Sequence, residues 1–205
     1  MAIEELAISF ESKPLPAKAS AYLAEANRRI DRLFESGRNK RIPRFIPSDA
    51  IAIYNALDFI TSEDFPLGRV YCEWGSGYGI GSCFAALLGY EAYGIEIEPW
   101  LVEQSAQLAT KFDSSATFAE GSFVPPEYQG ETKHLDSERI PPTDGACAFD
   151  EIGLELTDFD LIFAYPWPGE EEWLYELMRR HARPDAILLT YDAQECYRSK
   201  VVSRL

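Results

Sequence analysis

The sequence has few of the residues that usually hold metal ions or form disulfides, with 4 cysteines and 2 histidines among 205 residues. No two cysteines have C-x-x-C spacing, so neither a zinc site nor a disulfide framework is indicated. The start, M-A-I-E-E-L, lacks the basic residues and the long apolar core of a secretory signal. No run of about 18 apolar residues occurs, so no membrane-spanning helix is predicted. We therefore expect a cytoplasmic protein that binds no metal and does not enter a membrane.

Positive charge is also scarce, because 19 Lys and Arg face 34 Asp and Glu, giving a net charge of -15. Nucleic-acid binding relies on Lys and Arg, so a broad surface that follows phosphates is disfavoured. The charge is uneven: residues 1–44 hold nine basic and six acidic residues, a charge of +3, which leaves -18 on the other 161 residues. This basic segment could contact an anionic partner or neutralise its own domain, and the second is favoured. The sequence does not indicate an oligomeric state.

The order of apolar and polar segments predicts a single domain of ordinary size. Residues 1–16 contain two prolines and are expected to be irregular, and a helix is expected over 18–36, so that 1–44 form an N-terminal helical arm. The main domain spans 45–205, and residues 124–157 form a long polar insertion, which is typical of a lid or a partner surface. Residues 192–205 leave room for one more strand at most. Strands are expected at 70–73, 92–97, 117–123, 159–165 and 186–191.

Alternating strands and helices predict an α/β fold, a doubly wound and mostly parallel sheet with helices on both faces. In such sheets, ligands bind at the carboxyl ends of the strands. Glu73, Glu96, Ser122 and Tyr165 fall at or just after predicted strand ends. We therefore expect these four residues to converge on one site.

The stretch 70–100 joins a glycine loop to two acids. Gly75, Gly77 and Gly79 follow the first strand, which ends in Glu73, and the second strand carries Glu96. A glycine-rich turn lets a ligand approach the backbone closely, and the helix that follows offers N–H donors. The spacing of the loop therefore decides which ligand fits.

Two phosphate-bearing ligands do not fit this loop. A triphosphate site would need G-x-x-x-x-G-K-[ST], and no lysine occurs between Lys40 and Lys111. A dinucleotide site would need G-x-G-x-x-G, but the sixth positions counted from the first two glycines are Ile80 and Ser82. The acid ahead of the loop, Glu73, would also face a pyrophosphate unfavourably.

S-adenosylmethionine has no phosphate and carries a sulfonium and an ammonium, so an acid ahead of the loop is favourable. The sequence resembles class I S-adenosylmethionine-dependent methyltransferases, whose acid-x-G-x-G-x-G signature it carries at residues 73–79, with Glu96 as the second acid that accepts from the ribose hydroxyls. The resemblance covers about residues 45–192. It implies a Rossmann-like domain with the strand order 3-2-1-4-5, plus at most one extra strand, and methyltransferase activity with S-adenosylmethionine as the cofactor.

The resemblance also implies where the cofactor binds. Ser122 stands where the family commonly has an Asp near the adenine, and its hydroxyl can still meet the adenine amino group. Tyr165 falls at the end of the fourth strand and lines the site. The expected cofactor-binding residues are Glu73, Gly75, Ser76, Gly77, Gly79, Glu96, Ile97, Gly121, Ser122 and Tyr165.

The sequence gives less information about the methyl acceptor. The Y-P-W-P stretch at 165–168 makes Tyr165 and Trp167 the candidate catalytic residues, either as an aromatic wall around a methylammonium-like centre or as plain packing. It differs from the Asn/Asp-Pro-Pro-aromatic signature of enzymes that methylate nucleic-acid amines. A protein side chain or a small molecule is therefore favoured over nucleic acid as the acceptor.

One finer interpretation and two rival functions stay open. The segments F-I-P-S-D and G-I-E-I-E-P-W-L-V look like those of small protein-lysine methyltransferases related to the mitochondrial type, which suggests a subgroup without fixing a substrate. The alternative function is a non-catalytic protein that binds S-adenosylmethionine or acts as a scaffold on the same fold. A nucleotide-dependent oxidoreductase ranks third, because the dinucleotide motif fails.

Overall fold

The computed structural model describes residues 2–6, 8–42, 45–129, 145–167, 169–191 and 197–203. None of the helices in these ranges has the length and apolar content that a membrane crossing requires. The helices and strands follow in the order β1 (Ala2–Leu6), α1 (Ala17–Glu35), η1 (Arg38–Arg41), α2 (Ala50–Ser62), β2 (Val70–Trp74), α3 (Ile80–Leu87), β3 (Glu91–Glu96), α4 (Pro99–Lys111), β4 (Thr117–Glu120), α5 (Pro126–Gln129), α6 (Ala148–Ile152), η3 (Leu156–Asp158), β5 (Leu161–Ala164), α7 (Glu171–His181), β6 (Ile187–Tyr191) and β7 (Tyr197–Ser203).

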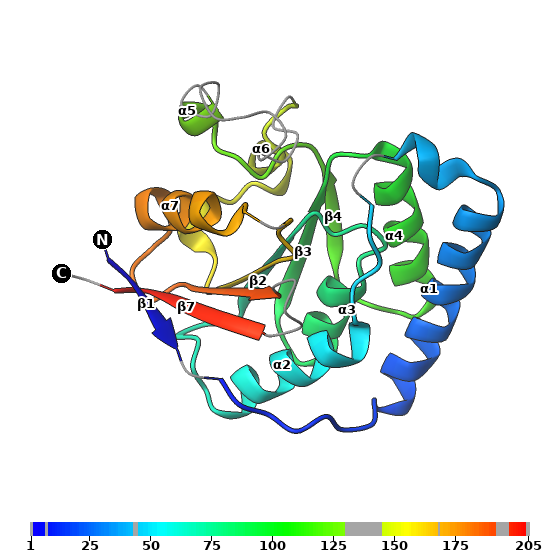
Figure 1. The fold of residues 1–205 in the computed structure, drawn as a ribbon, viewed down its shortest axis with the longest axis horizontal. Helices are drawn as coiled ribbons and strands as arrows, with labels where there is room; N and C mark the ends of the chain where they lie inside the picture. Colours follow the sequence, from blue (N-terminus) through cyan, green and yellow to red (C-terminus); the bar gives the residue numbers. More distant parts are fainter. Residues whose placement is uncertain are drawn as a thin grey trace.

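The described residues form one seven-stranded sheet in the order β1-β7-β6-β5-β2-β3-β4 (Figure 1). Five adjacent strands of this sheet, β4, β3, β2, β5 and β6, are parallel and lie in the predicted order, which confirms the α/β class. β7 and β1 extend the sheet as antiparallel strands. The prediction of at most one extra strand was wrong, because residues 2–6 pair with β7 along their whole length instead of being irregular. This strand depends on a distant partner, which a short local pattern does not reveal.

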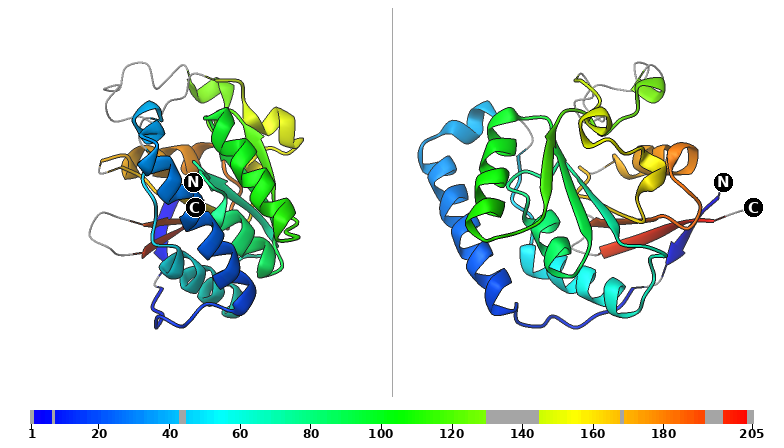
Figure 2. Two further views of the ribbon diagram at one scale, coloured as in Figure 1. Left: turned by 90° about the vertical axis from the view of Figure 1, so that its right-hand side faces the viewer. Right: turned by 180° about the vertical axis from the view of Figure 1, so that it is seen from behind.

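Both faces of the sheet are covered by helices (Figures 1 and 2). On the face of α1 to α4, Tyr71 and Phe163 belong to a hydrophobic core shared with these helices. On the opposite face, Cys72 and Ile162 belong to a core shared with α5, α6 and α7. Successive side chains of a strand point to opposite faces, so continuous apolar strands such as β5 fill both cores at once.

Local signals set where several helices begin. The Asp49 carboxylate accepts hydrogen bonds from the backbone N–H groups of Ile51 (3.1 Å) and Ala52 (3.0 Å), and so caps α2. Pro99 is the first residue of α4, where its missing N–H costs nothing.

The helix α1 lies against α3 and α4 and is part of the same core (Figure 2). Its buried stripe includes Ala19, Tyr22, Ala26 and Leu33, each at most 2% exposed. This spacing of three and four residues is that of an amphipathic helix, and it accounts for the helix predicted over 18–36. The division into an arm at 1–44 and a domain at 45–205 stays a prediction.

The polar insertion at 124–157 contains the short helices α5 and α6 in its described parts. β4 ends at Glu120, earlier than predicted, because Gly121 turns the backbone with φ +143°. Residues 130–144 lie outside the described residues, so a lid in this segment stays a prediction.

Candidate functional site

A cavity of about 480 Å³ opens at the carboxyl ends of β2, β3 and β5. Its volume is in the usual range for small-molecule sites. The cavity brings together most of the residues named from the sequence, while Gly79 does not line it. Those at its wall are Glu73, Gly75, Ser76, Gly77, Glu96, Ile97, Gly121, Ser122, Tyr165 and Trp167.

The glycine loop is fixed to the end of β3 by its own backbone. The N–H groups of Gly75 and Ser76 both donate to the carbonyl of Ile95 at 2.9 Å, and the N–H of Gly77 donates to Oε2 of Glu96 at 2.9 Å. Gly77 has φ +54°, a conformation that glycine adopts at little cost. The conformation of the loop is therefore set by the protein's own hydrogen bonds.

Gly79 has a different position from the other loop glycines. It has φ +68° and precedes the first residue of α3. A Cβ atom at this position would lie 2.3 Å from Cε1 of Phe118, a side chain from β4. Gly79 therefore allows the first turn of α3 to pack against β4.

Glu96 lies at the centre of the cavity wall with 8% of its surface exposed. Its Oε2 accepts from Gly77, and its Oε1 accepts from the N–H of Glu98 at 3.0 Å. Burial raises the pKa of this carboxyl, against the effect of these backbone hydrogen bonds. A carboxylate has about four acceptor positions, so Glu96 keeps capacity to accept from ligand hydroxyls.

Glu73 lies beneath the first turn of α3. Its Oε2 accepts from both the N–H and the hydroxyl of Ser82, at 2.7 Å each, so the carboxylate stabilises the helix start as well as lining the cavity. Burial raises the pKa of Glu73 to about 7, although the hydrogen bonds from Ser82 act in the opposite direction. The sequence analysis placed Glu73 at the site but did not identify Ser82 as its partner.

The raised pKa of Glu73 predicts a pH dependence of stability. The folded state holds this proton more tightly than the unfolded state, so the free energy of unfolding falls as pH rises from about 4.5 to 7, by roughly 3 kcal/mol. Glu73→Gln cannot ionise and should flatten this fall, as measured by urea unfolding between about pH 5 and about pH 8. Glu103→Gln on the exposed face of α4 is the control. Equal slopes for the wild type and Glu73→Gln would contradict the prediction.

The charged side chains among the described residues that line this cavity are all carboxylates. Glu73, Glu96 and Glu170 line it, and among its described lining residues there is no Lys, Arg or His. A phosphate would find no cationic partner there, whereas a cationic ligand would meet favourable charge. The charges of the lining residues therefore fit a positively charged ligand without phosphate.

Gly121 and Ser122 form the wall at the end of β4. The N–H of Ser122 donates to the carbonyl of Ala146 at 2.8 Å, and the Ser122 carbonyl accepts from Ala148 at 3.0 Å. Its hydroxyl oxygen accepts from the N–H of Val124 at 3.1 Å, so the hydroxyl proton can still be donated to a ligand.

Tyr165 and Trp167 form the rim after β5. The ring of Tyr165 lies against that of Tyr191 with centroids 5.3 Å apart, and Trp167 is 40% exposed. The buried Glu170 accepts from the N–H of Trp167 at 2.8 Å and so holds this turn.

Several lining residues were missed from the sequence. Trp74 stacks on Phe123 with ring centroids 4.7 Å apart, and Tyr78 meets Phe45 edge to face at 5.8 Å. Phe45 belongs to the two-proline connector before α2, and its place at the cavity wall was not predicted from the sequence. The available signal for its role was that this connector contains apolar residues, which are exceptional in a polar linker.

No family model matches the sequence, and no curated protein sequence matches it. Solved structures do resemble the fold. An RNA methyltransferase from Salinibacter ruber in complex with S-adenosyl-L-homocysteine is 15% identical over 78% of this chain and 95% of that protein, with a TM-score of 0.54. An O-methyltransferase from Bacillus cereus, also with S-adenosyl-L-homocysteine, is 11% identical over 86% of this chain and 66% of that protein, with a TM-score of 0.48.

A putative caffeoyl-CoA O-methyltransferase from Staphylococcus aureus is 13% identical over 83% of this chain and 71% of that protein, with a TM-score of 0.47. The Salinibacter ruber structure carries the comparison, and at its level of identity the likeness concerns the fold. The local similarity to protein-lysine methyltransferases stays a prediction. The chain has the Rossmann-like fold of class I S-adenosylmethionine-dependent methyltransferases.

Proposed function

We propose that this protein is an S-adenosylmethionine-dependent methyltransferase. The observation that carries the proposal is the buried carboxylate of Glu96, which lines a cavity without cations and is hydrogen-bonded to the glycine loop. The sequence signature puts the ribose-binding acid at this position. The shared fold with a methyltransferase that binds S-adenosyl-L-homocysteine supports the same reading.

The residues of the cavity have distinct roles in this proposal. Glu96 accepts from the ribose hydroxyls, and the backbone of Gly75 and Gly77 lets the ligand approach closely. Ile97 and Ser122 contact the adenine. Glu73, when ionised, contributes negative charge beside the cationic part of the ligand. Ser76, Gly121 and Tyr165 complete the wall, and Gly79 acts by positioning α3.

When bound, S-adenosylmethionine would supply a methyl group on a sulfonium: an acceptor would bond to this carbon in line as the carbon–sulfur bond breaks, with neutral S-adenosylhomocysteine as the leaving group. Catalysis of such a transfer can rest on orientation and on removal of water. Tyr165 and Trp167 are placed to orient the acceptor at the cavity rim. We propose a protein side chain or a small molecule as this acceptor, because the rim is aromatic and the described residues that line the cavity include no Lys, Arg or His to pair with a phosphate.

Calorimetry with S-adenosylhomocysteine tests the binding claim, and a saturable heat is the expected result. Absence of saturable heat with folded protein would overturn it. Transfer of a labelled methyl group to fractionated lysate then tests the activity, with incorporation expected in the protein or small-molecule fraction. Binding without incorporation in any fraction would favour the non-catalytic alternative, and incorporation into nucleic acid would refute the proposed acceptor class.

A further inference from the structure

A second pocket of about 370 Å³ lies between α1, η1 and α4. We call it the basic pocket, because Arg29, Arg32 and Arg38 line it together with Trp100, Gln104 and Gln107. Tyr78 belongs to its wall and also to the wall of the cavity described above. The two spaces therefore share one wall residue.

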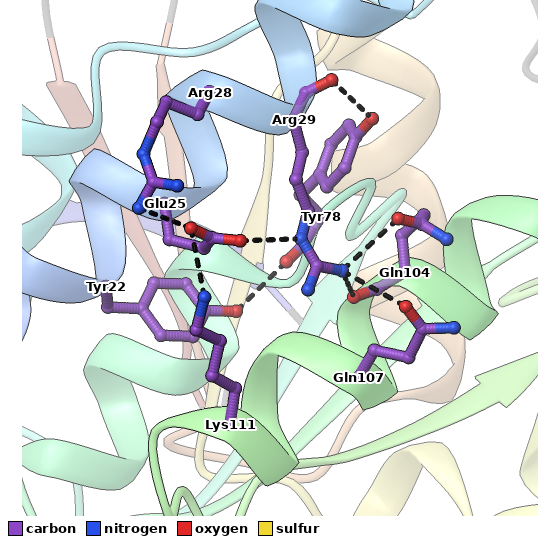
Figure 3. A network of polar contacts seen from close by, with 8 residues as sticks. All are labelled: Tyr22, Glu25, Arg28, Arg29, Tyr78, Gln104, Gln107 and Lys111. Carbon is purple, nitrogen blue, oxygen red and sulfur yellow. Dashed lines mark hydrogen bonds and ion pairs between the residues drawn. The ribbon is translucent and has the colours of Figure 1, made fainter.

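Arg29 forms the floor of the basic pocket and is held by four acceptor contacts (Figure 3). Its Nη1 donates to the carbonyl and the Oε1 of Gln104, at 3.3 and 3.2 Å, and to Oε1 of Gln107 at 3.3 Å. Its Nε donates to Oε1 of Glu25 at 3.3 Å. Arg29 is thus fixed in place and ties α1 to α4.

Glu25 is the acid among the described residues that line the basic pocket, and its charge is already compensated. It is 5% exposed and forms ion pairs with Arg28, Arg29 and Lys111 (Figure 3). The hydrogen bond from Lys111 holds the pKa of Glu25 below its usual value, so it stays ionised. Three cations share one carboxylate, and the surroundings of the pocket remain positive.

Arg32 and Arg38 add charge that no carboxylate balances. In the described part of the chain neither side chain has an ion pair, although acids outnumber basic residues 34 to 19 overall. The guanidinium of Arg38 lies over the ring of Trp100, 4.5 Å from its centroid, which fixes it beside the start of α4. Two exposed cations beside a positive cluster make the local potential positive, which favours an anion between them.

The start of α4 adds to the same effect. Its first turn contains no acid, and the side chain of Glu98, the residue that precedes the helix, makes no capping hydrogen bond. The dipole of a helix favours an anion near its N-terminus, and this contribution remains although Pro99 has no N–H and the N–H groups of Leu101 and Val102 already donate to the carbonyl of Glu98. Arginine is suited to phosphate, because its planar guanidinium donates two parallel hydrogen bonds.

We propose that the basic pocket binds the phosphate group of a small molecule, with Arg32 and Arg38 as its direct ligands and Arg29 as the residue that positions the wall. The pocket is bounded by three elements, and most of the chain outside residues 1–44 is acidic, with a charge of -18. An extended polyanion would meet that repulsion, whereas a single phosphate would not. The proposal does not depend on the methyltransferase activity.

Titration of the full chain with inorganic phosphate, followed by NMR of the arginine Nε–H signals, tests the proposal. Saturable shifts of the Arg32 and Arg38 signals are expected. The double variant Arg32→Gln/Arg38→Gln should raise the Kd at least about tenfold, since each charged hydrogen bond lost is worth that much or more. The control Lys40→Gln/Arg41→Gln removes the same charge from the neighbouring η1 but no residue of the pocket, and should change the Kd by less than about threefold.

Each other outcome speaks against the basic pocket. Shifts that never saturate, or an equal loss in both double variants, would indicate diffuse attraction only and overturn the proposal. So would binding of single-stranded RNA without binding of phosphate. Repeating the titration with S-adenosylhomocysteine present separates the two spaces: competition would place the phosphate in the larger cavity and refute the assignment, whereas unchanged shifts would support it. Because phosphate itself is the probe, the result stands even if S-adenosylhomocysteine fails to bind.

Discussion

Glu96→Ala is expected to weaken binding of S-adenosylhomocysteine by about 1.5–3 kcal/mol, which corresponds to a roughly 10- to 150-fold increase in Kd. In the proposed function the buried carboxylate receives hydrogen bonds from two ribose hydroxyls, and alanine would leave both without an acceptor. It also releases the N–H groups of Gly77 and Glu98, so the loop loses one of its hydrogen bonds to β3 and keeps those from Gly75 and Ser76 to Ile95. Calorimetry at fixed pH gives the change in Kd.

Two further variants separate recognition from folding. Glu96→Gln keeps an oxygen that can accept from Gly77 and should lose less affinity than Glu96→Ala. Glu103→Ala removes an exposed acid from α4 and should bind as the wild type does. An affinity for Glu96→Ala within about twofold of wild type, in a protein with unchanged thermal unfolding, would show that the cofactor does not use this carboxylate.

Gly79→Ala should lower the free energy of unfolding by about 2–5 kcal/mol. Two costs add: about 1–2 kcal/mol for a side chain at φ +68°, and about 1–3 kcal/mol because the new Cβ would lie 2.3 Å from the Phe118 ring. Domains are commonly stable by about 5–15 kcal/mol, so the variant is expected to be near the limit of folding. Urea unfolding measures the loss.

The chain offers a matched control for this change. Gly89 has φ +90° but open space around its Cβ position, so Gly89→Ala should show the backbone cost alone, about 1–2 kcal/mol. Adding Phe118→Leu to Gly79→Ala should restore part of the loss by making room. Equal losses at Gly79 and Gly89, with no recovery in the double variant, would mean that contact with β4 is not the reason for a glycine at position 79.

The central part of the fold could be predicted because its signals are local. Continuous apolar strands, the cap at Asp49 and the proline that begins α4 each depend on a few neighbouring residues. The two acids and the glycine loop are also close in sequence, and they meet at one cavity as predicted from the topology of a parallel sheet.

What could not be predicted depends on distant contacts. β1 pairs with the distant β7, and Phe45 reaches the cavity wall from a connector that has no strand or helix pattern. The partner of Glu73 is Ser82, which the sequence offers as one hydroxyl among many small residues of α3. Arg32 and Arg38 of the basic pocket are visible as charge in the sequence, but that neither forms an ion pair with the described residues emerges only from the packing of α1 and η1 on α4.

The pairing of β1 with β7 also sets an order of events during synthesis. Ala2 lies opposite Ser203, so β1 leaves the ribosome long before its partner β7 is synthesised. The parallel strands and their helices can assemble in the meantime, since β2, β3 and β4 are consecutive in both the chain and the sheet, as are β5 and β6. Closing so long a loop is costly in entropy and slow, so the antiparallel edge is expected to form last. In this order, β1 completes the sheet after the carboxyl ends of the parallel strands, where the cavity lies, are already in place.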